Sequence, residues 1–338
     1  MDQGPEKSVL LFGAYKNGNI GDQFQASSVA SHIRAVRSDL GVDATSNSRA
    51  ERDYEFEFGQ RIEPASAIGD PEVVNRYSAL VIGGGGLLAS VHRPMDSQSW
   101  VESVKIPIIL LSLGVSEDAL EKCRPLVERA EVVSGRDDFS CEMISRIRSD
   151  VRYLNDPILT DPRLDAAPAP TRPGRLTVIP RKQTDRYRQV YTLLEAELAP
   201  DDLVVSMFPA TDEASGVFDT FPASPTARLT TMSELCEQID GSGVVVSSRY
   251  HGCIIALKRG APCIGTVNST SDRASKIGEL FKQIGHEHLL VSFTQTPRNR
   301  AAIMEAAAEF DAAAVGARIA EMRDSFRTSL KEILDSVV

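Results

Sequence analysis

Short apolar runs that end in glycine or serine, each followed by a polar loop or a helical pattern, recur along the first half of the chain. These runs read VLLFG, ALVIG, IPIILLSL and EVVS, and they begin at Val9, Ala79, Ile106 and Glu131. Continuous apolar runs are typical of strands buried on both faces, and strands that alternate with helices form parallel sheets covered by helices. The alternation therefore predicts an α/β domain with a parallel sheet.

A second series of the same kind follows a segment rich in proline, DPILTDPRLDAAPAPTRPG at residues 156–174. Proline at this density is typical of a linker. Further strands are expected over residues 176–179, 203–207, 244–247 and 263–267. We predict an N-terminal α/β domain over residues 1–160, a linker over 161–174, a second α/β domain over 175–310, and C-terminal helices over 311–338. The last helices either pack back on the first domain or make an oligomer contact.

Composition excludes several classes of function. The chain has 338 residues, 42% hydrophobic and 25% charged, with a formal net charge of −10. This charge predicts no general affinity for nucleic acid or anionic membrane, so an anionic substrate needs local cations. The five cysteines show neither CxxC nor zinc-ligand spacing, which favours a reduced, cytoplasmic protein without a metal site. No apolar stretch has the length of a signal-peptide core or a membrane span, so membrane contact is expected to be peripheral at most.

Two glycine-rich segments follow predicted strands of the first domain. The first, NGNIGD, contains Asn19, Gly21 and Asp22, and its glycines suit the approach of a ligand to backbone amides. The alternative is a simple turn with Asp22 as helix N-cap. The second is the GGGG run that contains Gly84 and Gly85, where the backbone is expected to pass close to something bulky or to a packed helix. Neither segment has the GxGxxG or P-loop pattern.

Candidate cations and proton carriers lie at the ends of predicted strands. His92 follows the glycines on a loop, where a histidine is more often simply solvated. Arg136 follows EVVS, and it binds an anion or pairs with the neighbouring aspartates on the surface. Arg181 and Lys182 follow the first strand of the second domain, and their alternative is a solvated loop.

The strongest pair is Arg249 and His251, at the end of VVVS and at the start of a helix that Gly252 opens. A structural histidine is the alternative. Arg273 and Lys276 follow the next strand and supply further positive charge to the same rim. Because the carboxyl ends of parallel strands meet at one edge, these cations together predict a site for a small polyanion.

The motifs GNIGD, GGGG, SLGVS, GRDDFS, NDPIL and SSRYHGCIIALKRGAPCIG occur in this order. Over about residues 8–285 the chain resembles the polysaccharide pyruvyl transferase family. The resemblance implies a GT-B-like fold of two Rossmann-like domains facing across a cleft, with the acceptor on the N-terminal side and the donor on the C-terminal side. It also implies transfer of an enolpyruvyl unit from phosphoenolpyruvate to a sugar, as a pyruvate ketal, without a metal or redox cofactor.

The resemblance further implies roles for individual residues. His251 is then the general acid/base and Arg249 the anion clamp, with Arg136 as a second anion ligand. Asn19 and Asp22 lie at the rim of the substrates, where Asp22 accepts a hydroxyl proton, and His92 contributes from the opposite domain. The family often has an aromatic residue after the GxP strand, where this chain reads TVNSTSDRASK. The wall of the donor site is therefore expected to differ here.

The expected partners are phosphoenolpyruvate and a saccharide or lipid-linked saccharide of an exopolysaccharide or cell-wall precursor, with a homo-oligomer as a further possibility. Two other functions stay open. A nucleotide-sugar glycosyltransferase of the same architecture needs an acidic residue late in the second domain, for which Glu279 is a weak candidate. A non-catalytic glycan- or anion-binding protein is the other.

Overall fold

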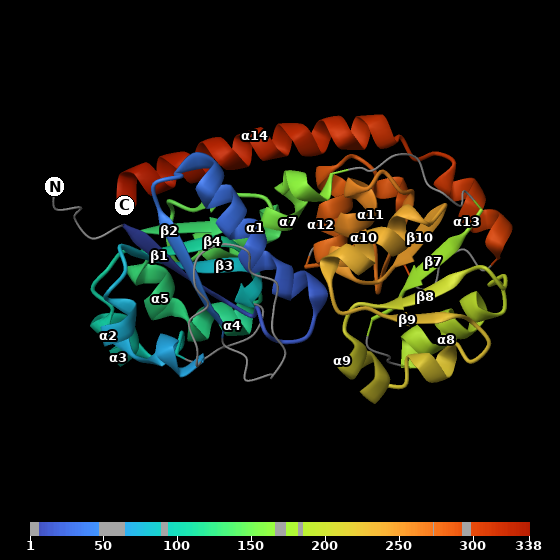
Figure 1. Cartoon of the computed structure of the whole chain (residues 1–338), viewed down its shortest axis with the longest axis horizontal. Helices are drawn as coiled ribbons and strands as arrows, with labels where there is room; N and C mark the ends of the chain where they lie inside the picture. Colours follow the sequence, from blue (N-terminus) through green and yellow to red (C-terminus); the bar gives the residue numbers. More distant parts are fainter. Residues whose placement is uncertain are drawn as a thin grey trace. The chain divides into compact units, whose positions relative to one another are not determined.

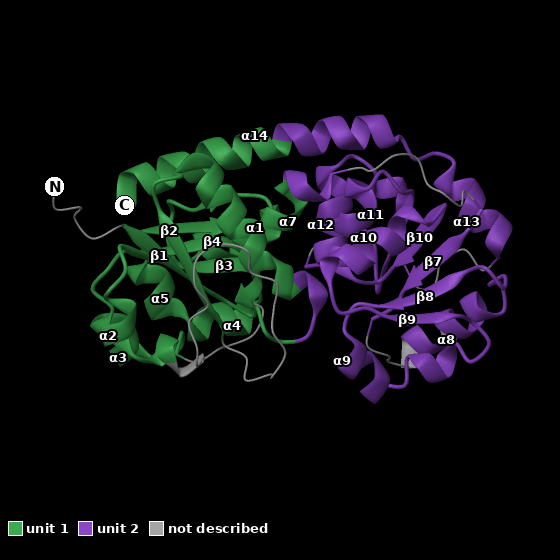
Figure 2. Cartoon of the chain, in the orientation of Figure 1, with its two compact units in different colours: residues 1–17, 22–161, 322–338 green, residues 18–21, 162–321 purple. Residues whose placement is uncertain are grey.

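The computed structural model describes residues 7–46, 65–88, 94–165, 174–181, 185–272, 274–292 and 299–338. The chain divides into two compact units, coloured separately in Figure 2. Unit 1 contains residues 1–17, 22–161 and 322–338, and unit 2 contains residues 18–21 and 162–321. The division differs from the linear domains expected from the sequence in that residues 18–21 group with unit 2. The end of the last helix groups with unit 1, in agreement with the alternative that the last helices pack back on the first domain. Most of the proline-rich segment, residues 166–173, lies outside the described residues.

Unit 1 is built on a six-stranded parallel sheet with the order β2-β1-β3-β4-β5-β6 (Figure 1). Its strands are β1 (Ser8–Gly13), β2 (Gly41–Ser46), β3 (Ala79–Leu88), β4 (Ile108–Val115), β5 (Val132–Gly135) and β6 (Arg152–Tyr153). Its helices are α1 (Ile20–Val36), α2 (Pro71–Val74), α3 (Gln98–Ser103), α4 (Glu117–Lys122), α5 (Arg124–Arg129), α6 (Asp138–Ser145) and α7 (Pro157–Thr160), with a 3₁₀ turn at Ala65–Gly69.

Both faces of this sheet are buried, as the continuous apolar runs indicate. Along β1, Leu10 and Phe12 belong to one hydrophobic cluster, and Val9 and Leu11 belong to another. Successive side chains of a strand point to opposite faces, so each cluster fills one side of the sheet.

Unit 2 contains a second six-stranded parallel sheet, with the order β12-β11-β10-β7-β8-β9. Its strands are β7 (Leu176–Ile179), β8 (Leu203–Ser206), β9 (Thr226–Arg228), β10 (Val244–Ser247), β11 (Cys263–Val267) and β12 (Leu290–Ser292). Its helices are α8 (Asp185–Glu195), α9 (Pro209–Ala214), α10 (Met232–Asp240), α11 (Tyr250–Lys258), α12 (Lys276–Gln283) and α13 (Arg300–Ala307), with 3₁₀ turns at Pro162–Leu164, Phe218–Thr220 and Glu287–Leu289. The prediction of two α/β domains with parallel sheets is confirmed.

One local expectation was wrong: the GGGG run does not follow a strand, because β3 continues through it to Leu88 with a register shift. Gly41 opens β2, an edge strand whose polar sequence GVDATS lacks the apolar run of a central strand. The C-terminal helix α14 (Ala312–Val337) continues through Gly316, where a Cβ atom would meet nothing within 4 Å.

Helix α14 connects the two units along the chain and ends in the core of unit 1. Phe326, Leu330, Ile333 and Leu334 are buried in the same cluster as Val29 of α1. The Phe326 ring lies 4.6 Å from the His32 ring, measured between centroids. Among the described helices, none is both long and apolar enough to cross a membrane.

The C-terminal helix should therefore stabilise unit 1. We expect Phe326→Ala to lower the free energy of unfolding by about 3–5 kcal/mol, because it removes a buried aromatic ring from the core. Urea unfolding followed by circular dichroism measures the change, and Ser325→Ala, on the exposed side of the same turn, is the matched control. Equal effects of the two substitutions would show that the helix end is not part of the core.

Candidate functional site

The chain turns sharply at the carboxyl end of β10 in unit 2. Arg249 is the N-cap of α11, and its backbone N–H donates to Ser247 Oγ at 3.1 Å. The helix begins at Tyr250, before the predicted start at Gly252. A Cβ atom at Gly252 would lie 2.6 Å from Ser247 Oγ and 3.2 Å from a methyl carbon of Ile179. The glycine thus lets the first turn of the helix lie directly against the strand ends.

His251 lies in this first turn and is only 7% exposed. The backbone of Gly21 packs against its imidazole: a Cβ atom there would lie 2.6 Å from the His251 Cβ and would overlap the ring atoms Nδ1 and Cγ. Asn19 Oδ1 accepts from the Gly21 N–H at 3.1 Å, and the Ile20 N–H donates to the Met207 carbonyl at 3.1 Å. Residues 18–21 of the GNIGD motif therefore meet the RYHG motif within unit 2.

Arg249 is held in a buried ion pair that the sequence did not predict. Its Nη2 donates to Asp212 Oδ1, and its Nε donates to the Pro180 carbonyl at 2.9 Å. Burial lowers the pKa of Arg249 and raises the pKa of Asp212, and the opposite charge of each partner works against the shift. Asp212 lies on α9, shortly after the strand LVVS, and its place after a strand end is the signal that would have identified it.

Arg181 and two tyrosines lie at the end of the neighbouring strand β7. The backbone N–H of Arg181 donates to Tyr191 Oη at 3.1 Å and to Ser248 Oγ at 3.0 Å. Its exposed guanidinium lies 5.5 Å from the centre of the Tyr187 ring. Burial raises the pKa of Tyr187, while the nearby positive charges of Arg181 and Arg249 act to lower it. Two guanidinium groups therefore lie at the carboxyl edge of β7 and β10, the exposed one of Arg181 and that of Arg249, which is paired with Asp212.

Aromatic side chains complete this edge. The Phe208 ring lies 5.9 Å from the Arg249 guanidinium carbon, and it also packs against Gly18. The Tyr250 ring lies 5.3 Å from the His251 ring, measured between centroids. These rings come from the ends of β8 and β10, and not from the segment after the GxP strand.

The candidate residues of unit 1 lie at the carboxyl end of its own sheet, around a buried arginine. Arg136 is 2% exposed, its Nη1 donates to Asp156 Oδ2 at 3.1 Å, and its Nε lies 3.6 Å from Asp137 Oδ2. A Cβ atom at Gly114 would lie 2.7 Å from its Nη2, so the guanidinium rests on the Gly114 backbone. Of the alternative of a surface pairing with the neighbouring aspartates, the pairing with Asp137 is present but its surface location was wrong, because the pair is buried and also involves Asp156 of the NDPIL motif.

The glycines of β3 approach helix α1 in the same unit. Gly84 and Gly85 have φ angles of +73° and +94°, and a Cβ atom at Gly84 would lie 2.6 Å from Gln25 Oε1. Gln25 Nε2 in turn donates to Asp156 Oδ1 at 2.9 Å. Close packing of a helix is thus one reason for the glycine run, and the helix is α1 rather than the following one.

The alternative prediction of Asp22 as an N-cap was wrong, because Asp22 lies in the first turn of α1, where its Oδ2 accepts from Asn17 Nδ2 at 2.7 Å. A Cβ atom at Gly85 would lie 3.9 Å from Asp22 Oδ1, so the carboxylate lies beside the glycine run.

The structure thus brings the candidates together in two groups. Unit 2 holds Asn19, Gly21, Arg181, Arg249, His251 and Gly252, and unit 1 holds Asp22, Gly84, Gly85 and Arg136. Lys276 is the first residue of α12 in unit 2. His92, Lys182 and Arg273 lie outside the described residues.

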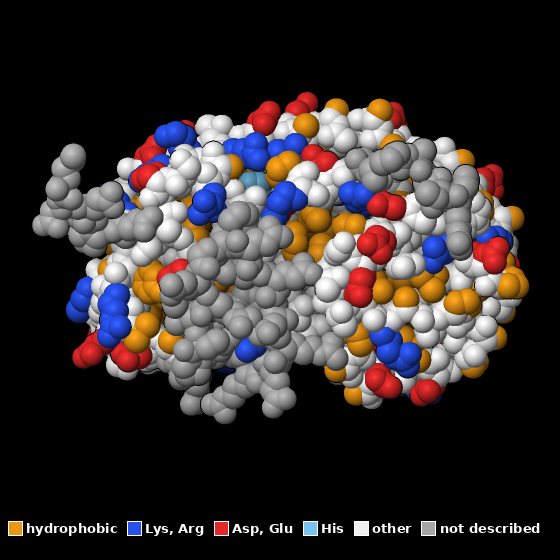
Figure 3. Space-filling model, viewed as in Figure 1, with side chains coloured by type: hydrophobic (Ala, Val, Ile, Leu, Met, Phe, Trp, Pro, Cys, Tyr) orange, Lys and Arg blue, Asp and Glu red, His pale blue; other side chains and the backbone are white. Residues whose placement is uncertain are grey.

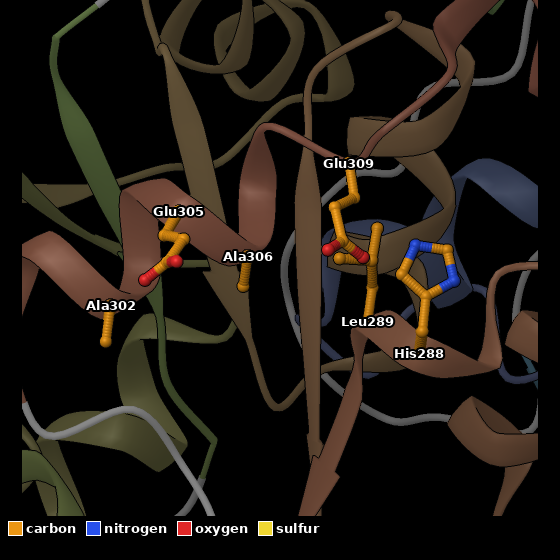
Figure 4. Close-up of a pocket in the computed structure, with 6 residues that line it drawn as sticks. All are labelled: His288, Leu289, Ala302, Glu305, Ala306 and Glu309. Atoms are coloured by element: carbon orange, nitrogen blue, oxygen red, sulfur yellow. The ribbon is translucent and has the colours of Figure 1, made fainter.

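Two other features do not coincide with these groups. A cavity of about 260 Å³ in unit 2 is lined by His288, Leu289, Ala302, Glu305, Ala306 and Glu309 (Figure 4). On the face shown in Figure 3, acidic and basic side chains are interspersed over the described surface. Within the described ranges, no three His, Cys, Asp or Glu side chains are grouped to hold a metal ion.

A sequence model of the family described as polysaccharide pyruvyl transferase matches residues 19–270. The chain belongs to the polysaccharide pyruvyl transferase family. The matched range begins at Asn19 and includes His251, whereas Lys276 and the residues lining the cavity of Figure 4 follow it. No curated protein sequence matches the chain.

Solved structures place this family member among GT-B proteins by fold. A Listeria monocytogenes protein described as a UDP-N-acetylglucosamine 2-epimerase has a TM-score of 0.61 at 9% identity, over 99% of this chain and 98% of that one. S. aureus MnaA, solved with UDP, has a TM-score of 0.59 at 9% identity, over 98% and 97%. An O-GlcNAc transferase mutant of Thermobaculum terrenum has a TM-score of 0.55 at 13% identity, over 99% and 68%. At these identities the likeness shows the fold alone.

The contact between Gly21 and His251 can be tested without an assay of activity. We expect Gly21→Ala to lower the free energy of unfolding by about 1–3 kcal/mol, because the added methyl overlaps the imidazole. Thermal unfolding measures the loss. Gly316→Ala is the matched control, since nothing lies within 4 Å of a Cβ atom there, and we expect it to be neutral or stabilising. A Gly21→Ala protein as stable as the control would contradict the packing.

Proposed function

We propose that this pyruvyl transferase uses phosphoenolpyruvate as donor and forms a pyruvate ketal on a saccharide of an exopolysaccharide or cell-wall precursor, in the cytoplasm. The observation that carries the proposal is the meeting of the two family motifs at Gly21 and His251, beside the guanidinium groups of Arg181 and Arg249. The same edge of the unit 2 sheet thus holds an imidazole and two guanidinium groups, which supports the assignment of proton transfer and anion binding to it.

The charges at this edge suit a small polyanion. Phosphoenolpyruvate carries a phosphate and a carboxylate, and guanidinium groups bind both with directed hydrogen bonds. The positive charge of Arg181 contributes to lowering the pKa of Arg249, so the two cations lie close enough to repel each other. The amino end of α11, which lacks a side-chain cap, adds a further positive potential. A bound anion would relieve this concentration of positive charge.

The proposed reaction balances without a redox step. A proton adds to C3 of the donor, the first sugar hydroxyl attacks C2, the bond from C2 to the phosphate oxygen breaks, and a second hydroxyl attacks C2. Of the two hydroxyl protons, one replaces the proton delivered to C3 and the other leaves with the phosphate. His251 is the group we assign to proton transfer, since an imidazole can donate and accept protons near neutral pH.

Asp22 follows Gly21 directly in the chain, and we assign it to the acceptor hydroxyl. Its carboxylate is already a hydrogen-bond acceptor for Asn17. Arg136, which is buried and paired with Asp156, is assigned to anion binding only through the family motif.

Incubation of the protein with phosphoenolpyruvate and a panel of saccharide acceptors tests the proposal. We expect release of phosphate together with an acceptor product that carries a pyruvate ketal, detected by mass spectrometry. A parallel thermal-shift series compares phosphoenolpyruvate with UDP, GDP and CMP sugars. Stabilisation by a nucleotide sugar alone, together with sugar transfer, would replace this proposal with a glycosyltransferase.

Replacement of the proposed acid/base should remove most of the turnover. We expect His251→Ala to lower kcat by about 10²–10⁴-fold, which is the usual contribution of a positioned proton carrier. Phosphate release under saturating donor measures kcat. His288→Ala, an exposed histidine in unit 2, is the control and should leave kcat unchanged. Turnover of His251→Ala within a few-fold of the native value would contradict the assignment.

The exposed guanidinium of Arg181 should contribute mainly to the affinity for the donor. We expect Arg181→Gln to raise the KM for phosphoenolpyruvate about tenfold, because a charge-assisted hydrogen bond is worth about 1.5–3 kcal/mol. Arg188→Gln, an exposed arginine on α8, controls for the change in net charge. The same KM for both variants would remove Arg181 from the donor site.

A further inference from the structure

Asp212 is a fully buried carboxylate at the edge where the candidate residues of unit 2 meet. It lies on α9, and its Oδ2 accepts from Ser206 Oγ at 2.6 Å, at the last residue of β8. The Phe208 backbone N–H donates to the same Ser206 Oγ at 3.3 Å. These bonds attach the carboxylate to the end of the strand, so its own position is fixed by the sheet.

Asp212 and the backbone together hold two of the three nitrogens of the Arg249 guanidinium. Nη2 donates to Asp212, and Nε donates to the Pro180 carbonyl. Nη1 has no acceptor within the described part of the chain. Because a guanidinium is planar, fixing two nitrogens also fixes the direction of the third.

We propose that Asp212 is a positioning residue for the donor site: it fixes the guanidinium plane of Arg249 so that Nη1 donates to a phosphate or carboxylate oxygen of the donor. This inference rests on the proposed function. It also divides the work between the two arginines. The charge of Arg249 is balanced by Asp212, so Arg249 supplies a directed hydrogen bond, while the exposed Arg181 and the amino end of α11 supply net positive charge.

The chain contains a matched control at the opposite end of the same sheet. Asp202 is 1% exposed, immediately precedes β8, and pairs with Arg300. It also accepts from the Leu176 and Ala199 N–H groups, each at 2.7 Å. Asp202→Asn and Asp212→Asn therefore both neutralise a buried aspartate that pairs with an arginine in unit 2, at opposite edges of the sheet.

The test compares steady-state kinetics of these two variants with phosphoenolpyruvate as the varied substrate. We expect both to lower the melting temperature. In Asp212→Asn, kcat should fall about 10–100-fold, because the guanidinium of Arg249 is no longer aligned for the transition state. KM should change by less than about threefold, because the positive charge that Asp212 no longer balances still attracts the donor. In Asp202→Asn, kcat per folded molecule should change by less than about threefold.

A double-mutant cycle with Arg249→Gln separates positioning from general loss of structure. If Asp212 acts through Arg249, the double variant should lose no more kcat/KM than Arg249→Gln alone, so the deviation from additivity should match the Asp212→Asn effect of about 10–100-fold. Additive losses, or equal kinetics of Asp212→Asn and Asp202→Asn, would overturn the inference while leaving the proposed function in place.

An inactive native protein would overturn the proposed function instead. The same double-mutant cycle is then measured on dissociation constants for phosphoenolpyruvate, by calorimetry. A coupling between the effects of the Asp212 and Arg249 substitutions on binding supports the positioning role. Additive effects on binding, or no binding of phosphoenolpyruvate, overturn it.

Discussion

The backbone at Gly21 has no room for a side chain, because the His251 imidazole lies against it. This contact requires three conditions. Helix α11 must begin immediately after β10, which Gly252 permits by removing a clash with Ser247 and Ile179. The loop after β1 must reach unit 2, where Ile20 donates to the Met207 carbonyl. The histidine must then be buried, at 7% exposure. The candidate site of unit 2 depends on these glycines more than on any single charged group.

Each unit also buries one arginine at the carboxyl edge of its sheet and balances it with an aspartate. Arg249 pairs with Asp212 in unit 2, and Arg136 pairs with Asp156 in unit 1. A buried charge is tolerated only when a partner compensates it. In both pairs the aspartate and the arginine come from different segments of the chain. Each ion pair therefore links two segments that lie at the carboxyl edge of the same sheet. The arginines are therefore fixed in place, and under the proposed function each would supply a directed hydrogen bond to an anionic ligand.

The sequence predicted the elements that carry strong local signals. Central strands such as β1 and β10 are continuous apolar runs, because both of their faces are buried. The predicted end of β10 therefore gave the correct position of Arg249 and His251 in the fold. The edge strands β2, β6, β9 and β12 were missed, because short or polar strands carry no such run. The partners of the arginines were missed for a different reason: Asp212 and Asp156 lie far from Arg249 and Arg136 in the chain, and only the folded sheet brings them together. The glycines illustrate the same limit, since φ angles and clashes with Gln25 or His251 are properties of the fold.

The central claim is that the carboxyl edge of β7, β8 and β10 binds the donor. A crystal structure with phosphoenolpyruvate bound tests it most directly. We expect a phosphate or carboxylate oxygen within hydrogen-bonding distance of Arg249 Nη1, near the first turn of α11, with C3 of the donor facing the His251 imidazole. Phosphoenolpyruvate bound away from this edge, with Arg249 and His251 making no contact to it, would contradict the account.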